Sequence, residues 1–353
     1  MTVLKLGSLF DGIGVFPLAA VHCGMEPVWA SEIEARPISI TKRHFPDMLH
    51  LGDITKISGA EIPPVDVITF GSPCQDLSQI GTRNGFAGKK SSLFYQAMRI
   101  IEEMRYATNG RYPAFTVWEN VAGAFSSNDR LDFAAMLSAF TGAEVSVPPR
   151  GWAHAGMVRG GRADTAWRLL DAQYWGEPAL AQRRTRVFVV ADFAGQRAGE
   201  VLFKPRTVLP FSAIGGPGGL SATAGSGVPA AQTGRQVPIV RPFSLRRMRT
   251  MAQVGDQKGF CASFGRGGEP FPTLLASVTA PFSFWYEGEE RDGFLRALTP
   301  LECERLMGLP ENWTKYGCKN EEISDHARYR ALGNSIALPC AEYVMAGIAE
   351  VMN

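Results

Sequence analysis

Short apolar runs alternate with helix-like stretches over the first 192 residues of the chain. Runs bounded by Gly, Pro or polar residues indicate buried strands at 3–9, 28–31, 65–70, 115–118 and 187–191. Between them, residues 93–105 carry apolar side chains at helical spacing, and an apolar segment at 16–23 ends at Gly24, a residue typical of helix ends. This alternation predicts an α/β fold with a parallel sheet and helices on its faces. In such a fold, ligands bind just outside the carboxyl ends of the strands.

The pattern changes near Gly195. Residues 215–234 consist mainly of Gly, Ala, Ser, Thr and Pro, which form neither a helix nor a central strand. Clustered arginines follow at 241–249, then turn-rich sequence with β-like runs, and a helical apolar pattern returns only at 339–351. We therefore predict a first domain at 1–192, completed by a C-terminal helix at 328–353, and a smaller, irregular, β-rich domain at 193–327.

Composition and charge set broad limits on the class of protein. The 353 residues are 45% hydrophobic and 20% charged, as in an ordinary globular protein of about two domains. The sequence has no basic region leading into an apolar stretch and no apolar window near the roughly 18 residues of a membrane span, so we expect a cytoplasmic protein with reduced thiols. A net charge of +2 does not by itself indicate a nucleic-acid partner.

One of the six cysteines stands where α/β enzymes do chemistry. Cys74 follows the apolar run 65–70 within Gly71-Ser72-Pro73-Cys74-Gln75. Pro73 fixes its own φ and pushes the preceding residue toward extended geometry, so the backbone that presents the thiol is stiff. The other cysteines match the usual pattern of small buried side chains, and no pair has the CxxC spacing of a metal site. We predict that Cys74 is a nucleophile and that the protein holds no metal.

A glycine-containing loop and two acidic residues suggest an adenosine-type cofactor. Phe10-Asp11-Gly12-Ile13-Gly14 follows the first predicted strand, and glycines at that position let a ligand approach the backbone. Glu32 ends the next predicted strand, where a carboxylate can accept hydrogen bonds from ribose, and Asp53 ends a further short segment. Because the third glycine of the dinucleotide motif and the GxxxxGK[ST] phosphate loop are both missing, S-adenosylmethionine fits better than a dinucleotide or a nucleoside triphosphate.

A carboxylate and two arginines are expected near the same sheet edge. Glu119 ends the strand that begins at Phe115, so it should emerge beside Cys74. A partly buried carboxyl has a raised pKa and can donate a proton. Arg184 and Arg186 precede a further strand and share one side if the segment is extended. A solvated carboxylate and a surface basic edge are the alternatives that these residues alone leave open.

The chain resembles the DNA (cytosine-5)-methyltransferases. The matching blocks follow the family's order from residue 7 to 339, at 10–14, Glu32, 52–54, 71–78, 119–121, 182–186, 296–310 and 332–339. The resemblance implies a Rossmann-like, S-adenosylmethionine-dependent methyltransferase sheet with a smaller target-recognition domain. The stretch 151–175 is similar to that of phage and prophage members, which implies a bacterial, phage or prophage origin.

The family resemblance also implies a mechanism. A thiolate at Cys74 adds to C6 of a cytosine flipped out of double-stranded DNA, and C5 then takes the methyl group, leaving S-adenosyl-L-homocysteine. Glu119 holds N3 and donates a proton, Arg184 stabilises the thiolate and cytosine O2, and Arg186 completes the catalytic set. The segment 76–90 is the expected lid over the base. The sequence identifies no base for the C5 proton.

Binding residues follow from the same resemblance. The cofactor-binding residues it implies are Phe10, Asp11, Gly12, Ile13, Gly14, Glu32, Asp53, Ile54, Pro73, Leu93, Asn334 and Ser335. The DNA-recognition residues it implies are Gln75, Ser78, Thr273 and Leu274. We expect a monomer that acts in restriction-modification or in the protection of phage or prophage DNA.

Two alternative functions share the fold. The tRNA cytosine-5 methyltransferases usually carry Pro-Pro-Cys-Gln and a Cys-Phe-Thr signature, whereas this chain has Ser72-Pro73-Cys74 and no Cys-Phe-Thr. A non-catalytic DNA-binding relative would be marked by loss of Cys74, Glu119 or the glycine loop, all of which are present. A cysteine hydrolase is disfavoured because none of the five histidines lies in a recognisable partner motif.

Overall fold

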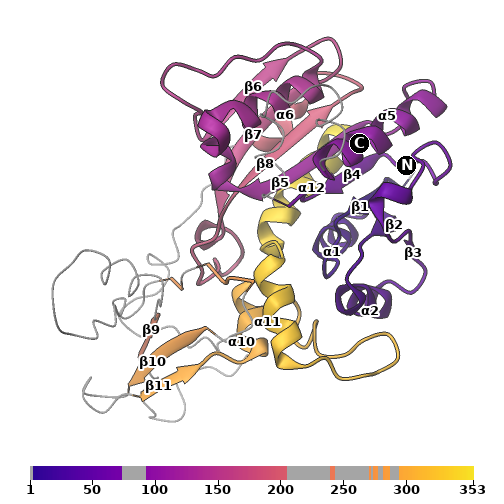
Figure 1. Cartoon of the computed structure of the whole chain (residues 1–353). Helices are drawn as coiled ribbons and strands as arrows, with labels where there is room; N and C mark the ends of the chain where they lie inside the picture. The colour runs from indigo at the N-terminus through magenta and orange to yellow at the C-terminus, as the bar shows by residue number, and fades with distance from the viewer. Residues whose placement is uncertain are drawn as a thin grey trace. The chain divides into compact units, whose positions relative to one another are not determined.

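The computed structural model describes residues 3–73, 93–204, 239–242, 270–271, 273–276, 281–286 and 294–353 (Figure 1). The chain forms two compact units. The first comprises Met1–Leu170, Thr185–Arg206 and Cys340–Asn353, and the second comprises Asp171–Arg184 and Thr207–Pro339. Compared with the boundaries expected from sequence, 171–184 and 328–339 group with the second unit, and 193–206 with the first.

An eight-stranded sheet forms the centre of the first unit, in the order β3-β2-β1-β4-β5-β8-β7-β6. The strands are β1 (Lys5–Leu9), β2 (Glu26–Ser31), β3 (Leu49–His50), β4 (Val67–Phe70), β5 (Phe115–Val121), β6 (Ala155–Arg159), β7 (Asp164–Asp171) and β8 (Thr185–Asp192). The five strands from β3 to β5 are parallel, so their carboxyl ends share one edge. The predicted α/β sheet is confirmed, but β8 runs antiparallel to β5, and it follows the antiparallel β6–β7 pair.

Helices follow most of these strands along the chain. They are α1 (Val15–His22), α2 (Ala35–His44), α5 (Leu93–Ala107), α6 (Leu131–Thr141), α7 (Ala198–Leu202) and α12 (Leu338–Met352), with short 3-10 turns η1 (Ile54–Lys56), η3 (Ala122–Phe125) and η4 (Ser127–Arg130). The helix predicted at 93–105 is confirmed as α5, and it buries Phe94, Met98, Ile101 and Met104 along one stripe. Within the described ranges no single helix is long and apolar enough to cross a membrane; the consecutive helices α11 (Asp325–Asn334) and α12 reach the threshold only when taken together.

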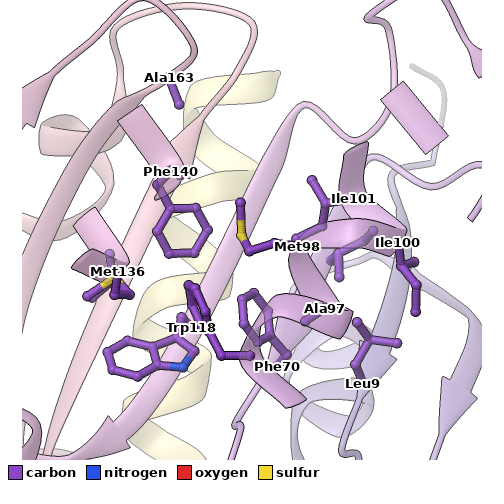
Figure 2. Packing of buried hydrophobic residues seen from close by; sticks show 14 of the residues in the cluster. Leu9, Phe70, Ala97, Met98, Ile100, Ile101, Trp118, Met136, Phe140 and Ala163 are labelled. Atoms are coloured by element: carbon purple, nitrogen blue, oxygen red, sulfur yellow. The ribbon is translucent and has the colours of Figure 1, made fainter. Parts of the chain in front are cut away.

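An aromatic core fixes the strands that lead to the candidate site. The Phe94 ring of α5 lies 6.1 Å from Phe70 at the end of β4, 6.2 Å from Trp118 in β5 and 5.9 Å from Phe140 in α6, measured between ring centroids. Figure 2 shows Phe70, Trp118 and Phe140 together with Met98 in this cluster. Each such side chain contributes about 1.5–3 kcal/mol by burial, so the ends of β4 and β5 are firmly placed.

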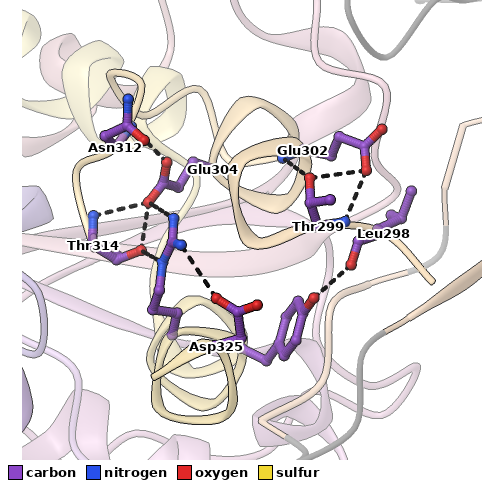
Figure 3. Close-up of polar contacts among 9 residues, drawn as sticks. Leu298, Thr299, Glu302, Glu304, Asn312, Thr314 and Asp325 are labelled. Atoms are coloured by element: carbon purple, nitrogen blue, oxygen red, sulfur yellow. Dashed lines mark hydrogen bonds and ion pairs between the residues drawn. The ribbon is translucent and has the colours of Figure 1, made fainter. Parts of the chain in front are cut away.

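Among its described residues, the second unit holds a small antiparallel sheet and two helices. Strands β9 (Ile239–Pro242), β10 (Phe282–Tyr286) and β11 (Phe294–Ala297) are arranged in the order β11-β10-β9. Helix α10 (Pro300–Leu306) begins with a capping box between Thr299 and Glu302, and proline at its first position suits that start (Figure 3). The short turn η5 (Ala172–Tyr174) also belongs to this unit.

A buried ion pair connects α10 to α11. Glu304 is fully buried and accepts the backbone N–H groups of Asn312 and Thr314, each at 2.8 Å. Arg328 of α11 donates to the same carboxylate at 3.1 Å and pairs with Asp325 at 3.4 Å (Figure 3). Because Glu304 has several donors, its buried charge is compensated, and the start of α11 is fixed.

Candidate active site

Three consecutive residues of β5 hold the segment that leads to Cys74. Trp118 donates from Nε1 to the Ser72 hydroxyl at 3.0 Å, and Asn120 donates from Nδ2 to the Ser72 carbonyl at 2.9 Å. Between them, Glu119 lies so close that a Cβ on Gly71 would be 3.3 Å from its Oε2. Gly71 therefore gives the carboxyl room, and the backbone entering position 74 is clamped. Cys74 itself lies outside the described residues, as do Gln75 and Ser78.

Glu119 forms an ion pair with Arg186. The side chains approach to 3.2 Å between Oε1 and Nε, and Glu119 is only 8% exposed. In the antiparallel register, Glu119 faces Phe188 and Val121 faces Arg186, so the two charged residues are diagonal neighbours on one face of the sheet. A nearly buried carboxylate beside a guanidinium thus lies against the segment that precedes Cys74.

Arg184 has different partners from Arg186, although the sequence groups the two. It ends the second unit's segment 171–184, and its side chain is 1% exposed. The guanidinium donates to the carbonyl oxygens of Leu274 and Gly333, each at 2.9 Å, and also to that of Ser335. Its side chain is therefore committed to backbone acceptors.

The glycine loop after β1 and the acid at the end of β2 meet. Glu32 accepts the N–H of Gly12 at 2.9 Å through Oε2, and its Oε1 accepts those of Ile33 and Glu34 at 2.7 and 3.0 Å. Gly12 has a φ of 58°, and a Cβ there would meet nothing within 4 Å, so the loop borders open space. Phe10 also has a positive φ, of 54°, which costs a bulky residue about 1–2 kcal/mol and is typical of ligand sites.

The remaining candidate cofactor residues lie in both units. In the first, Ile13 and Ile54 are buried, Leu93 is half-buried at the start of α5, and Pro73 is exposed. Asp53 is half-exposed and accepts from the Thr55 amide and hydroxyl at 2.9 and 2.8 Å, which lowers its pKa and caps η1. In the second unit, Asn334 is exposed at the end of α11 and Ser335 is buried beside it.

Sequence reasoning missed Ile33. Its side chain is 72% exposed although it directly follows Glu32, whose carboxylate binds its amide. An exposed apolar surface of this size beside a carboxylate suits the face of a purine better than it suits water. The available signal was a lone apolar residue between Glu32 and Glu34 at the end of a strand.

The two DNA-recognition candidates that the structure describes differ in exposure. Thr273 is half-buried, and its hydroxyl donates to the Arg183 carbonyl at 2.7 Å. Leu274 is buried, with its carbonyl on Arg184. Of the two side chains, that of Thr273 is therefore the more accessible.

Within the described ranges, no group of three or more His, Cys, Asp or Glu side chains is placed to hold a metal ion.

Asp11 is a buried acid in the glycine loop. Burial raises its pKa from 3.8 to about 7; the charge of Glu32 adds to this, while the Ser8 and Thr41 hydroxyls oppose it. The folded protein therefore holds a proton on Asp11 that the unfolded chain releases at a lower pH. Wild-type stability should fall as pH rises from about 4 to about 7, through the interval between the two pKa values.

We expect Asp11→Asn to remove that loss, because the amide stays neutral. Urea unfolding at pH 8 should show the variant more stable than wild type by at most about 4 kcal/mol, since one pKa unit corresponds to about 1.4 kcal/mol. Near pH 4 the advantage should disappear. Asp53→Asn is the matched control, because hydrogen bonds from Thr55 lower the pKa of Asp53, so no gain at pH 8 is expected. If the free energy of unfolding had the same pH dependence in wild type and in Asp11→Asn, Asp11 would not be the group with the raised pKa.

The family model of C-5 cytosine-specific DNA methylases matches residues 4–203 and 246–350. The type II methyltransferase M.HhaI of Haemophilus parahaemolyticus is 22% identical, covering 100% of this chain and 96% of its own. A protein of Escherichia phage P1 named DNA N-6-adenine-methyltransferase is 25% identical over 98% of this chain, which spans only 61% of that longer protein. A crystal structure described as a DNA modification methyltransferase encoded within an E. coli prophage superposes with a TM-score of 0.59 at 18% identity, covering 99% of both chains.

Proposed function

Because the chain belongs to the C-5 cytosine-specific DNA methylase family, we propose that it transfers a methyl group from S-adenosyl-L-methionine to C5 of cytosine in double-stranded DNA. The observation that carries this proposal is the Glu119–Arg186 pair lying against Gly71, three residues before Cys74. A carboxyl, a guanidinium and a thiol are the groups that a cytosine needs for activation at C5. The family membership supports the reaction, and the geometry supports the roles proposed below.

Cys74 supplies the nucleophile in this proposal. Cytosine C5 is too weakly nucleophilic to take a methyl group directly, so the thiolate adds to C6, forming an S–C6 bond and making C5 enamine-like. A free thiol with a pKa of about 8.5 is only slightly ionised at neutral pH, and nearby positive charge increases the ionised share. The clamped segment 71–73 limits the conformations from which the thiol approaches.

Glu119 and Arg186 stabilise the charge that this addition creates. Electron density moves from the C5–C6 bond toward N3 and O2 as the S–C6 bond forms. Glu119, in its protonated form, holds N3 and delivers its proton there, and Arg186, already 3.2 Å from that carboxyl, donates to O2. We assign the O2 contact to Arg186 because the Arg184 guanidinium is committed to three backbone carbonyls. After methylation, loss of the C5 proton expels the thiolate and regenerates Cys74.

The first unit has the features that an adenosine-bearing methyl donor requires. Gly12 borders open space, Phe10 and Ile33 offer apolar surfaces, and Glu32 and Asp53 supply acceptors for ribose hydroxyls. When bound, the cofactor supplies an electrophilic methyl group on a sulfonium sulfur. Asn334 and Ser335 are the further residues that we assign to cofactor binding from the second unit.

Access to the target requires base flipping. C5 lies inside a duplex, so the cytosine must leave the stack at a cost of a few kcal/mol, which pocket and backbone contacts offset.

We assign DNA recognition to residues 193–327, including Thr273 and Leu274, with Gln75 and Ser78 close to the nucleophile in the sequence. The segment 76–90, for which the family resemblance implies a lid, lies outside the described residues. We place the enzyme in the cytoplasm as a monomer that protects cellular, phage or prophage DNA.

Expression in a host that lacks cytosine methylation tests the proposal. Bisulfite sequencing should show one short motif protected at a single cytosine, and nucleoside mass spectrometry should show 5-methylcytosine. N6-methyladenine in place of 5-methylcytosine would contradict the proposal and agree with the name of the phage P1 relative. Methylated tRNA with unmodified DNA would support the RNA alternative, and a folded, cofactor-binding protein with no methylated product would support the non-catalytic one.

A further inference from the structure

Arg184 lies where two distant segments of the second unit meet. From one side chain it donates to the Leu274 carbonyl at 2.9 Å, to the Gly333 carbonyl at 2.9 Å and to the Ser335 carbonyl. A guanidinium presents five N–H donors in a rigid planar fork, so it can bind both segments at once. One buried side chain thus joins segment 273–276 to segment 333–335.

The backbone beside Arg184 reinforces this junction. Phe271 donates its N–H to the Ala181 carbonyl and accepts the N–H of Arg183, both at 2.7 Å, which forms a short parallel bridge. Gln182 is fully buried and donates to the Leu306 carbonyl at 3.2 Å. The segment that carries Arg184 is therefore fixed both to the strand-like residues before 273 and to the end of α10.

Gly333 allows the two segments to touch backbone to backbone. A Cβ at this position would lie 2.2 Å from the Leu275 carbonyl oxygen and 2.3 Å from the Ala276 nitrogen. The other end of α11 is held by the pair between Arg328 and Glu304 (Figure 3). Residues 333–335 therefore have little freedom to move independently of 273–276.

We propose that Arg184 is a positioning residue that couples DNA binding to cofactor binding. This inference rests on the proposed function, in which Thr273 and Leu274 belong to DNA recognition and Asn334 and Ser335 to cofactor binding. Because Arg184 holds the two segments together, a ligand that restricts one segment also restricts the other, and the second ligand then loses less conformational entropy when it binds. Such coupling is reciprocal in binding free energy, and Arg184 exerts it without touching either ligand.

Hydrogen exchange on the wild-type protein tests the coupling without any substitution. S-adenosyl-L-homocysteine is the probe, because it binds without reacting. At saturation it should slow amide exchange in peptides covering 271–276, including the amides of Phe271 and Leu274. Bound probe with unchanged exchange at 271–276 would overturn the inference alone. Failure of the probe to bind at all would contradict the proposed function.

Arg184→Lys tests the role of the side chain. We expect wild-type protein to bind S-adenosyl-L-homocysteine at least about 5-fold more tightly when saturated with a duplex carrying its methylated motif. In Arg184→Lys, the ratio of the affinity with duplex to the affinity without it should fall to about 1. The lysine ammonium lacks the planar fork of donors that reaches both segments. Arg183→Lys is the matched control, since Arg183 is the exposed neighbour, and it should keep the wild-type ratio.

The alternative outcomes of this substitution are distinct. If Arg184 had a purely structural role, Arg184→Lys would weaken S-adenosyl-L-homocysteine binding equally with and without the duplex. The ratio of these two affinities would then stay at its wild-type value, which would overturn the inference. If Arg184→Lys does not fold, as judged by circular dichroism and thermal unfolding, the exchange result on the wild-type protein decides.

Discussion

Cys74→Ser is expected to lower kcat for DNA methylation by roughly 1,000-fold or more, with loss of all detectable protection in host DNA. A serine hydroxyl is scarcely ionised at neutral pH and is a much weaker nucleophile than a thiolate, so C6 is not attacked and C5 stays unreactive. Binding of S-adenosyl-L-homocysteine should change little, because the glycine loop and Glu32 are unaffected. Radiolabelled methyl transfer to plasmid DNA measures the loss directly.

Cys23→Ser is the matched control for that result. Burial, with a contribution from Glu342, raises the pKa of the Cys23 thiol to about 11, so this cysteine is not a nucleophile at neutral pH. Its replacement should leave methyl transfer at the wild-type rate. Substantial activity in Cys74→Ser would contradict the covalent mechanism.

Glu119→Gln is expected to lower kcat by about 100- to 1,000-fold, with a smaller effect on cofactor affinity. The amide can hold N3 by a hydrogen bond but cannot deliver a proton as charge develops there. It also leaves Arg186 without its carboxylate partner, so the base is less well oriented. Single-turnover methylation separates this chemical step from DNA binding and product release.

Glu26→Gln provides a control for the loss of a carboxylate charge. Glu26 is exposed at the start of β2, at the opposite end of that strand from Glu32, and its replacement should leave the rate unchanged. A wild-type single-turnover rate in Glu119→Gln would show that this residue is not the acid.

Local sequence patterns were enough to predict the parts of the fold that depend on periodicity. The stripe of apolar residues over 93–105 specifies α5, and apolar runs ended by Gly71 or Glu119 specify β4 and β5. Parallel pairing then brings Glu119 beside the segment that leads to Cys74. The family resemblance is confirmed over most of the chain.

The features that depend on long-range partners could not be predicted in the same way. In the sequence, Arg184 and Arg186 lie two residues apart on one side of the same extended segment, so their roles look alike. Only their tertiary partners distinguish them: the β5–β8 register places Arg186 beside Glu119, whereas Arg184 binds the distant carbonyls at 274, 333 and 335. Likewise, Asp11 looks like an ordinary loop acid until β1, β2 and α2 enclose it. Burial and tertiary hydrogen bonds, which no local pattern encodes, decide these roles.

Covalent trapping on fluorinated DNA tests the central claim most directly. A duplex in which 5-fluorocytosine replaces the cytosine of the methylated motif allows addition at C6 and methyl transfer. The fluorine at C5 cannot then leave as a proton does, so the S–C6 bond persists. With S-adenosyl-L-methionine present, we predict a denaturation-resistant protein–DNA complex whose peptide mass spectrum places the adduct on Cys74. Methylation of ordinary DNA without any trapped complex, or an adduct on another residue, would contradict the account.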